Sequence, residues 1–157
     1  MAVTSKTLMT YKHWKVETVQ FDDGAYACVA SVQNDSGSES FSIWASAQHE
    51  LQLQFYSSNW QFGNDDTADL NVEIDQRGPW SLTEAELSEN SVFFTLPGSD
   101  GAVNFLTEIA GGSILYLRSA SGQDVQSYSL FGSNASMNAL IDCGNAISGT
   151  ADKNPFN

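Results

Sequence analysis

Short segments in which apolar and polar residues alternate recur along most of this chain. The cleanest lies near the middle, where Leu70, Val72 and Ile74 alternate with acidic and amide side chains. Successive side chains of a β-strand point to opposite faces of a sheet, so this pattern predicts a strand with one buried face. Further segments of this kind follow at regular spacing between turn residues, which favours an antiparallel β fold.

Two segments instead carry apolar residues at helical spacing. The first spans 100–110, and the second begins at Ser133, a good N-cap residue. The positions expected to face the sheet are Val103, Leu106, Ile109, Met137, Leu140 and Ile141. Helices of about ten residues are unstable alone in water, so both must pack on the sheet.

We therefore expect a mostly β fold of the β-dominated α+β class. Its strands should form an antiparallel sandwich or curled sheet of about eight strands with two short helices. The 157 residues suit one domain, and no internal repeat or long linker divides them. We expect a flexible leader over 1–10, a single β-rich domain over 11–144 and a flexible tail over 145–157.

Two cysteines limit where the last helix can lie. Cys28 and Cys143 are 143 − 28 = 115 positions apart, which excludes a CxxC metal or redox motif. A disulfide would tie the last helix to an early strand and requires Cα atoms within about 7 Å of each other. We expect this disulfide, with two buried free thiols as the alternative.

The disulfide bears on where the protein works. Disulfides persist in oxidising compartments, so we expect a periplasmic or secreted protein. The first residues lack the apolar core of a signal peptide. The chain is then either a mature form without its signal peptide, with Met1 added, or a cytosolic protein.

The charge of the chain excludes several partners. Six basic and 19 acidic residues give a net charge of −13. Nucleic-acid binding needs lysine and arginine to neutralise phosphates, so we exclude it, and anionic membrane surfaces are disfavoured for the same reason. No apolar run approaches the roughly 20 residues that cross a bilayer. A basic protein partner is compatible with this charge, although the simpler interpretation, which we favour, is that the charge serves solubility.

No recognised catalytic pattern is present in the sequence. His13 and His49 are its only histidines, and no serine or cysteine nucleophile motif accompanies them. Three glutamates follow Ser81 and Thr83, and we interpret them as acids in a helical turn capped by one of these hydroxyls. These glutamates are Glu84, Glu86 and Glu89. We expect no enzymatic activity, no catalytic residue and no cofactor.

One acidic loop is a weak candidate for a metal site. Hard cations prefer several oxygen ligands from one flexible loop. The oxygen-bearing residues of this loop are Asn64, Asp65, Asp66 and Asp69. Since the glycine and glutamate of an EF-hand loop are missing, we interpret the segment as a solvated turn and expect no metal.

Aromatic residues gather near predicted strand ends and loops. They are Trp44, Tyr56, Trp60, Phe62 and Trp80. Exposed aromatic side chains often anchor a protein or sugar ligand, although they also pack well in β cores. Our hypothesis is a partner-contact patch formed by Tyr56, Trp60, Phe62 and Trp80, with core packing as the alternative.

Three segments carry a resemblance to a known family. The chain opens with Trp14-Lys15-Val16, continues with Tyr26-Ala27-Cys28 and closes with an aromatic-Ser-Leu-x-Gly-Ser segment over 128–133 before a helix and Cys143. In this layout it resembles the invasion-associated locus B proteins, small exported bacterial proteins. That family usually has a cysteine soon after the opening tryptophan, and this chain has none there. The resemblance implies a β-rich fold, export, a disulfide and no known catalysis.

These features together favour a binding role over an enzymatic one. We expect a non-enzymatic extracytoplasmic protein that binds another protein, as an accessory or assembly subunit, through an acidic surface with an aromatic contact patch. The alternative is a periplasmic inhibitor or immunity protein that acts on a basic enzyme such as a lysozyme.

Overall fold

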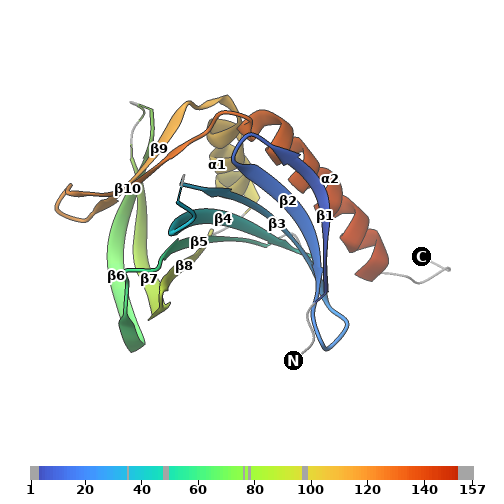
Figure 1. Ribbon diagram of the computed structural model, residues 1–157, viewed down its shortest axis with the longest axis horizontal. Coiled ribbons are helices and arrows are strands. Elements are labelled where there is room, and N and C mark those ends of the chain that lie inside the picture. Colours follow the sequence, from blue (N-terminus) through green and yellow to red (C-terminus); the bar gives the residue numbers. More distant parts are fainter. Residues whose placement is uncertain are drawn as a thin grey trace.

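The computed structural model describes residues 4–34, 36–47, 50–75, 77, 79–96 and 99–151, without the side chains of 64–65, 99–100 and 148–151. Within these residues, ten strands and two helices form the fold (Figure 1). The strands are β1 (Thr4–Tyr11), β2 (Trp14–Gln20), β3 (Tyr26–Gln33), β4 (Glu39–Ser46), β5 (Leu51–Ser57), β6 (Phe62–Ile74), β7 (Trp80–Glu89), β8 (Ser91–Thr95), β9 (Ile114–Ser119) and β10 (Asp124–Ser129). The helices are α1 (Ser99–Gly111) and α2 (Ser133–Ala151).

All the strands belong to one antiparallel sheet in the order β1-β2-β3-β4-β5-β8-β7-β6-β9-β10. The sheet curls so strongly that β10, at one edge, lies close to β3 and β4. It does not close into a barrel, because β1 and β10 remain its two edges. The expected mostly β fold with a curled antiparallel sheet and two helices is therefore confirmed.

One face of the sheet and both helices form the core. Figure 1 shows the helices together on one side of the sheet. Alternate residues of the strands point toward them, and Trp14, Val16, Phe41, Ile43 and Leu53 are almost completely buried there. We call this the helix-covered face. The opposite side, the open face, is not covered by either described helix.

The disulfide fixes α2 on the helix-covered face. Cys28 of β3 and Cys143 of α2 are bonded, with their Cα atoms 6.1 Å apart, as expected from the sequence. The Thr18 hydroxyl lies 3.3 Å from the sulfur of Cys143 and joins β2 to the same contact. Both cysteines are buried, so the bond is part of the core.

The buried helix positions differ in part from those expected. Met137 and Leu140 are buried as predicted, but Val103 is 60% exposed and Ile141 is 46% exposed. In α2 the buried stripe continues through Cys143 and Ile147. Because Cys143 must face β3, the buried stripe of α2 is centred away from Ile141, and Ile141 lies at the border of the stripe.

Both ends of the ordered fold extend further than the sequence predicted. α2 continues to Ala151 rather than ending near Cys143, because Ile147 adds another buried position. Likewise Thr4–Tyr11 forms β1, where a flexible leader was expected. Nearly all side chains of β1 are exposed, so its backbone pairing with β2 leaves no apolar pattern in the sequence. Residues 1–3 and 152–157 lie outside the description.

The acidic segments of the middle of the chain are strands rather than a loop and a helical turn. β6 runs through the segment 64–66, where the alternating pattern is broken, and its pairing with β7 shifts register twice. In β7, Leu82 and Ala85 are buried three positions apart, which imitates helical spacing. Glu84 between them has a positive φ of 59°, so a bulge resets the alternation. The predicted cap at Ser81 or Thr83 is therefore wrong.

A buried polar chain holds β10 against β5. The Tyr128 hydroxyl donates to Oε1 of Gln126 at 2.7 Å, and Nε2 of Gln126 donates to the Tyr56 carbonyl at 3.0 Å. Burial, and then the negative charge of Glu39, raises the pKa of Tyr128. The folded protein therefore favours the neutral phenol.

Removal of the disulfide should destabilise the protein strongly. The double variant Cys28→Ala/Cys143→Ala should lose about 4–5 kcal/mol of unfolding free energy, because an unfolded chain without the 115-residue crosslink gains loop entropy. Urea unfolding of both proteins, with and without reductant, measures this difference. Reductant should shift the midpoint of the wild type alone, and equal midpoints without reductant would contradict the prediction.

Alkaline pH should test the buried phenol. An unfolded tyrosine ionises near pH 10, so the stabilisation from neutral Tyr128 should be complete below about pH 10 and should fall as the pH rises further. Tyr128→Phe should lose about 1–3 kcal/mol at pH 7, because Gln126 is left without its donor, and its stability should decline less steeply above pH 10. The control is Tyr116→Phe, on the half-exposed Tyr116, and an alkaline decline unchanged by Tyr128→Phe would sink the prediction.

Candidate functional site

The structure brings together only part of the predicted contact patch. The Trp60 and Phe62 rings lie 5.5 Å apart, both half-buried against the core. Asn90 fixes their segment by donating to the Trp60 carbonyl at 2.6 Å. A cavity of about 460 Å³ opens beside them, between Gln61 and Glu89.

Of the other two aromatic residues, Trp80 lies far from this pair. Trp80 stands at the opposite end of the β6–β7 pair from Phe62, and its ring packs edge-on against Phe105 of α1 at 5.3 Å. Tyr56 is half-buried in β5, where it pairs with Ser91 of β8. The four residues of the predicted patch therefore do not form one surface.

The acidic residues have structural contacts in place of the predicted turn. The Asp69 carboxylate accepts the Glu84 N–H at 2.9 Å and so stabilises the bulge in β7. Asp66 is exposed on β6, while the side chains of Asn64 and Asp65 lie outside the description. Among the side chains that are described, no three of His, Cys, Asp or Glu gather as a metal site would require.

The described histidine, His13, and the three glutamates of β7 do not converge either. His13 is exposed in the turn between β1 and β2, and His49 lies outside the described residues. Glu84, Glu86 and Glu89 are all exposed along β7. Nothing in their arrangement resembles an acid–base pair across a substrate cleft.

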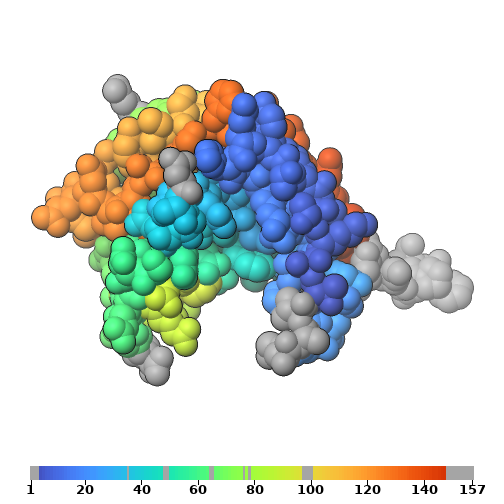
Figure 2. Space-filling view, in the orientation of Figure 1, coloured from blue at the N-terminus to red at the C-terminus, as the bar shows by residue number. Residues whose placement is uncertain are grey.

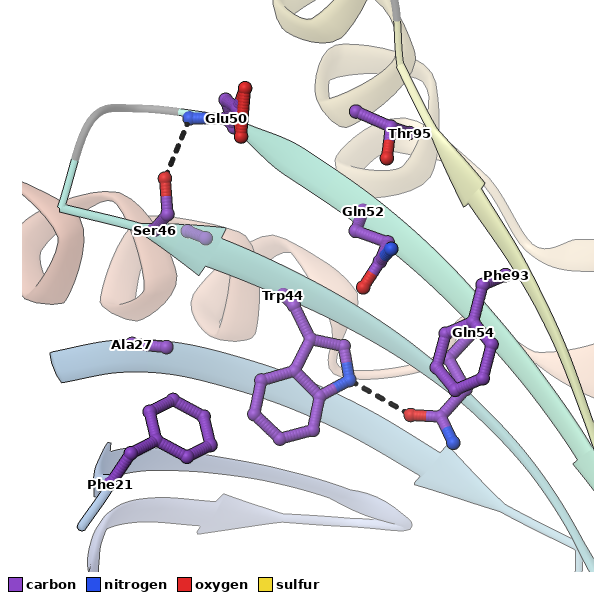
Figure 3. A pocket seen from close by; sticks show the side chains of 10 residues that line it. Phe21, Ala27, Trp44, Ser46, Glu50, Gln52, Gln54, Phe93 and Thr95 are labelled. Atoms are coloured by element: carbon purple, nitrogen blue, oxygen red, sulfur yellow. Dashed lines mark hydrogen bonds between the residues drawn. The ribbon is translucent and has the colours of Figure 1, made fainter. Parts of the chain in front are cut away.

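A different feature stands out on the open face. Figure 2 shows this side hollowed between β8, in yellow-green, and the β2–β3 turn, in blue. The hollow contains a cavity of about 490 Å³, within the range of small ligand sites. Its aromatic side chains are Phe21 from the turn, Trp44 from β4 and Phe93 from β8 (Figure 3). We call this the open-face cavity.

Trp44 is held in one orientation by its neighbours. Its indole N–H donates to Oε1 of Gln54 at 2.9 Å, and Nε2 of Gln54 donates to the Ser91 hydroxyl at 3.0 Å. The strand register explains these two hydrogen bonds. Gln54 pairs with Ser42 and Phe93 and therefore lies on the open face with Trp44. Figure 3 shows the indole lying across the sheet with its broad face toward the cavity. An anchoring ring of this kind is already ordered before any ligand arrives.

The surroundings of the cavity are negative. Among the described residues of its lining, Glu50 is the one that is charged, and none is a lysine or arginine. On the open face of β2, Lys15 forms an ion pair with Glu17 at 3.5 Å, so these two side chains add no net charge. In β9, the positive charge of Arg118 is offset by ion pairs with Glu73 at 2.9 Å and Asp124 at 2.8 Å. These carboxylates raise the pKa of Arg118, so it remains charged but paired.

Sequence reasoning noted Trp44 but did not place it in the contact patch. The available signal was its position between Ile43 and Ala45, which alternate with it and are buried on the helix-covered face. A large aromatic residue on the other side of such a strand must lie on the open face. Phe21 and Phe93 carry no comparable signal, because only the folded sheet brings them beside Trp44.

Known proteins resemble this chain in structure rather than in sequence. The sequence matches no family model and no curated protein. Its fold matches the crystal structure of invasion associated protein B from Bartonella henselae, with a TM-score of 0.59 at 16% sequence identity. The match covers 89% of this chain and 99% of the other. The two proteins share one fold.

The expected resemblance is thus confirmed at the level of the fold. At this identity it transfers no binding residue and no activity. Within the described part of the chain, no helix is both long enough and apolar enough to span a membrane.

The orientation of Trp44 should depend on Gln54. In Gln54→Leu, the indole N–H loses its acceptor, so hydrogen exchange at this group should accelerate and stability should fall by about 1 kcal/mol. Exchange of the Trp44 indole N–H, followed by NMR, measures the effect. The control is Gln52→Leu, two residues away on the same face of β5, and it should leave this exchange unchanged. Equal exchange in both variants would show that Gln54 does not hold the ring.

Proposed function

We propose that this chain is a non-enzymatic extracytoplasmic protein that binds another protein through its open face, as an accessory or assembly subunit. The observation that carries the proposal is the aromatic cavity on a sheet face that the described helices leave uncovered. A half-exposed tryptophan in such a position requires an explanation, because sheet faces left in water usually carry polar residues.

The chemistry of the open-face cavity suits a protein contact. Tryptophan is among the residues that contribute most to binding energy at interfaces, especially in partly enclosed positions. Because Trp44 is already fixed by Gln54, it loses little rotamer freedom when a partner binds. Phe21 and Phe93 extend the apolar surface to both sides of it.

An extracytoplasmic location is part of the proposal. The buried Cys28–Cys143 bond supports it, because such bonds are rare in reducing compartments. The shared fold with invasion associated protein B is compatible with it. A periplasmic or secreted subunit would use the crosslink to remain folded without a cytosolic chaperone system.

A second candidate function is inhibition of a basic enzyme such as a lysozyme by a periplasmic inhibitor or immunity protein. The net charge of −13 favours it, as does the pairing of Lys15 and Arg118 with carboxylates. Electrostatic steering would then accelerate encounter with a basic surface at low salt. The two candidates differ in whether the partner is an enzyme whose activity falls on binding.

Site-specific photocrosslinking in the native host tests the proposed function. A photoreactive phenylalanine analogue at position 93 should give one predominant protein adduct, since this position borders the open-face cavity. Trp44→Ala should abolish the adduct by removing the anchoring ring, whereas Trp60→Ala should leave it intact. Mass spectrometry identifies the adduct, and inhibition assays on it decide between the two candidates.

The control places the same photoreactive residue at position 131. Phe131 is 63% exposed, in the segment between β10 and α2, away from the open-face cavity. An adduct at position 93 that survives Trp44→Ala, or that also forms at position 131, would count against the open face as the contact. Loss of the adduct in Trp60→Ala alone would instead restore the patch predicted from the sequence.

A further inference from the structure

We infer that the open-face cavity receives an arginine side chain of the partner protein, with its guanidinium stacked on Trp44 beside Gln52 and its charge attracted by Glu50 at the rim of the cavity. This inference rests on the proposed function and specifies which chemistry the cavity recognises. Three observations carry it: the ring that the cavity presents, its charge, and the acceptor groups that border it.

The first observation is the presented ring. Tryptophan is the aromatic residue that binds cations best through its face. The indole N–H of Trp44 is already used by Gln54, so the ring offers the cavity its π-face rather than a hydrogen-bond donor. Phe21 and Phe93 stand on either side of it in Figure 3 and would contact the aliphatic stem of a long side chain.

The second observation is charge. Among the described residues that line the cavity, a ligand anion would meet one carboxylate, Glu50, and no lysine or arginine, on a chain with a net charge of −13. A recess in a surface of one sign concentrates its field, so a cation is favoured. Charge complementarity therefore selects a basic segment of a partner over an acidic or phosphorylated one.

The third observation is the set of acceptors. A guanidinium has five N–H donors and no acceptor. Gln52 pairs directly with Trp44 across β4 and β5, so its side chain reaches the edge of a group stacked on the indole. Glu50 precedes β5 and lies beside Ser46 at the rim of the cavity, from where its charge attracts a cation in the cavity (Figure 3). The described structure gives the side chains of Gln52 and Glu50 no hydrogen bond of their own.

These features favour arginine over lysine. A planar guanidinium can stack on the indole and donate sideways to Gln52 at the same time, while its charge faces the rim that carries Glu50. A lysine ammonium is a compact, strongly hydrated charge and would have to give up one of these contacts.

Two blocked tripeptides of identical shape test the inference. The probes are acetyl-Gly-Arg-Gly-amide and the same peptide with citrulline, the uncharged isostere of arginine. NMR titration of the labelled protein should show the arginine peptide shifting the Trp44 indole N–H with affinity of roughly millimolar order. The citrulline peptide should bind roughly tenfold more weakly, since it loses both the cation–π contact and the attraction of Glu50. Added salt should weaken the arginine peptide alone.

Matched variants locate the contact. Glu50→Gln should weaken the arginine peptide several-fold and leave the citrulline peptide unchanged. Asp142→Asn removes the same charge from an exposed position of α2 and should alter neither titration. Trp44→Leu should abolish both, whereas Phe131→Leu, at an exposed aromatic outside the cavity, should not.

The outcomes separate this inference from the proposed function. Equal affinities for the two peptides, or no binding of either while the adduct at position 93 persists, would overturn the arginine assignment and leave the protein-binding role intact. A tenfold preference for arginine that is lost in Glu50→Gln would support the assignment. That same preference, without any adduct at position 93, would support the cation site and contradict the proposed function.

Discussion

The bond between Cys28 and Cys143 decides which side of the sheet becomes the core. It places α2 against the face that carries Cys28, and the alternation of β-strands then assigns every second residue to that side. The register carries the assignment across the sheet, from Cys28 to Ala45 of β4 and on to Leu51 of β5. The neighbour of Ala45 in sequence, Trp44, is consequently left on the open face. One covalent constraint thus separates the stabilising side of the molecule from the side available for binding.

The open face both shields apolar side chains from water and keeps an aromatic ring accessible, two requirements that usually conflict. Val19 and Val29 lie on this side yet are almost fully buried, because large neighbouring side chains and the strong curl of the sheet shield them. Trp44 contributes to that shielding while keeping its own face accessible, and Gln54 holds it in place. A ring that both covers apolar surface and anchors a partner needs no rearrangement on binding, which keeps the entropic cost of association low.

The sequence was sufficient for features that depend on local pattern. The strand through Leu70 and Val72 and the disulfide were both predictable, from alternation and from cysteine placement. The bulge at Glu84 was not, because it makes two buried residues of a strand appear at helical spacing. The open-face cavity was also not predictable, since it requires the β5–β8 pairing that brings Phe93 beside Trp44. Such pairing between distant segments leaves no periodicity in either of them.

The nearly unbroken exposure of β1 has a consequence for how the protein behaves at high concentration. A sheet that stays open has free edges, and an apolar edge strand readily pairs with the same edge of another molecule. Here most of the side chains that β1 presents are polar, including Lys6, and its exposed apolar residues are limited to Leu8 and Tyr11. At the other edge, Asp124 is exposed and paired with Arg118. Both edges thus disfavour pairing between molecules, so an open sheet can persist in a crowded compartment without growing into fibres.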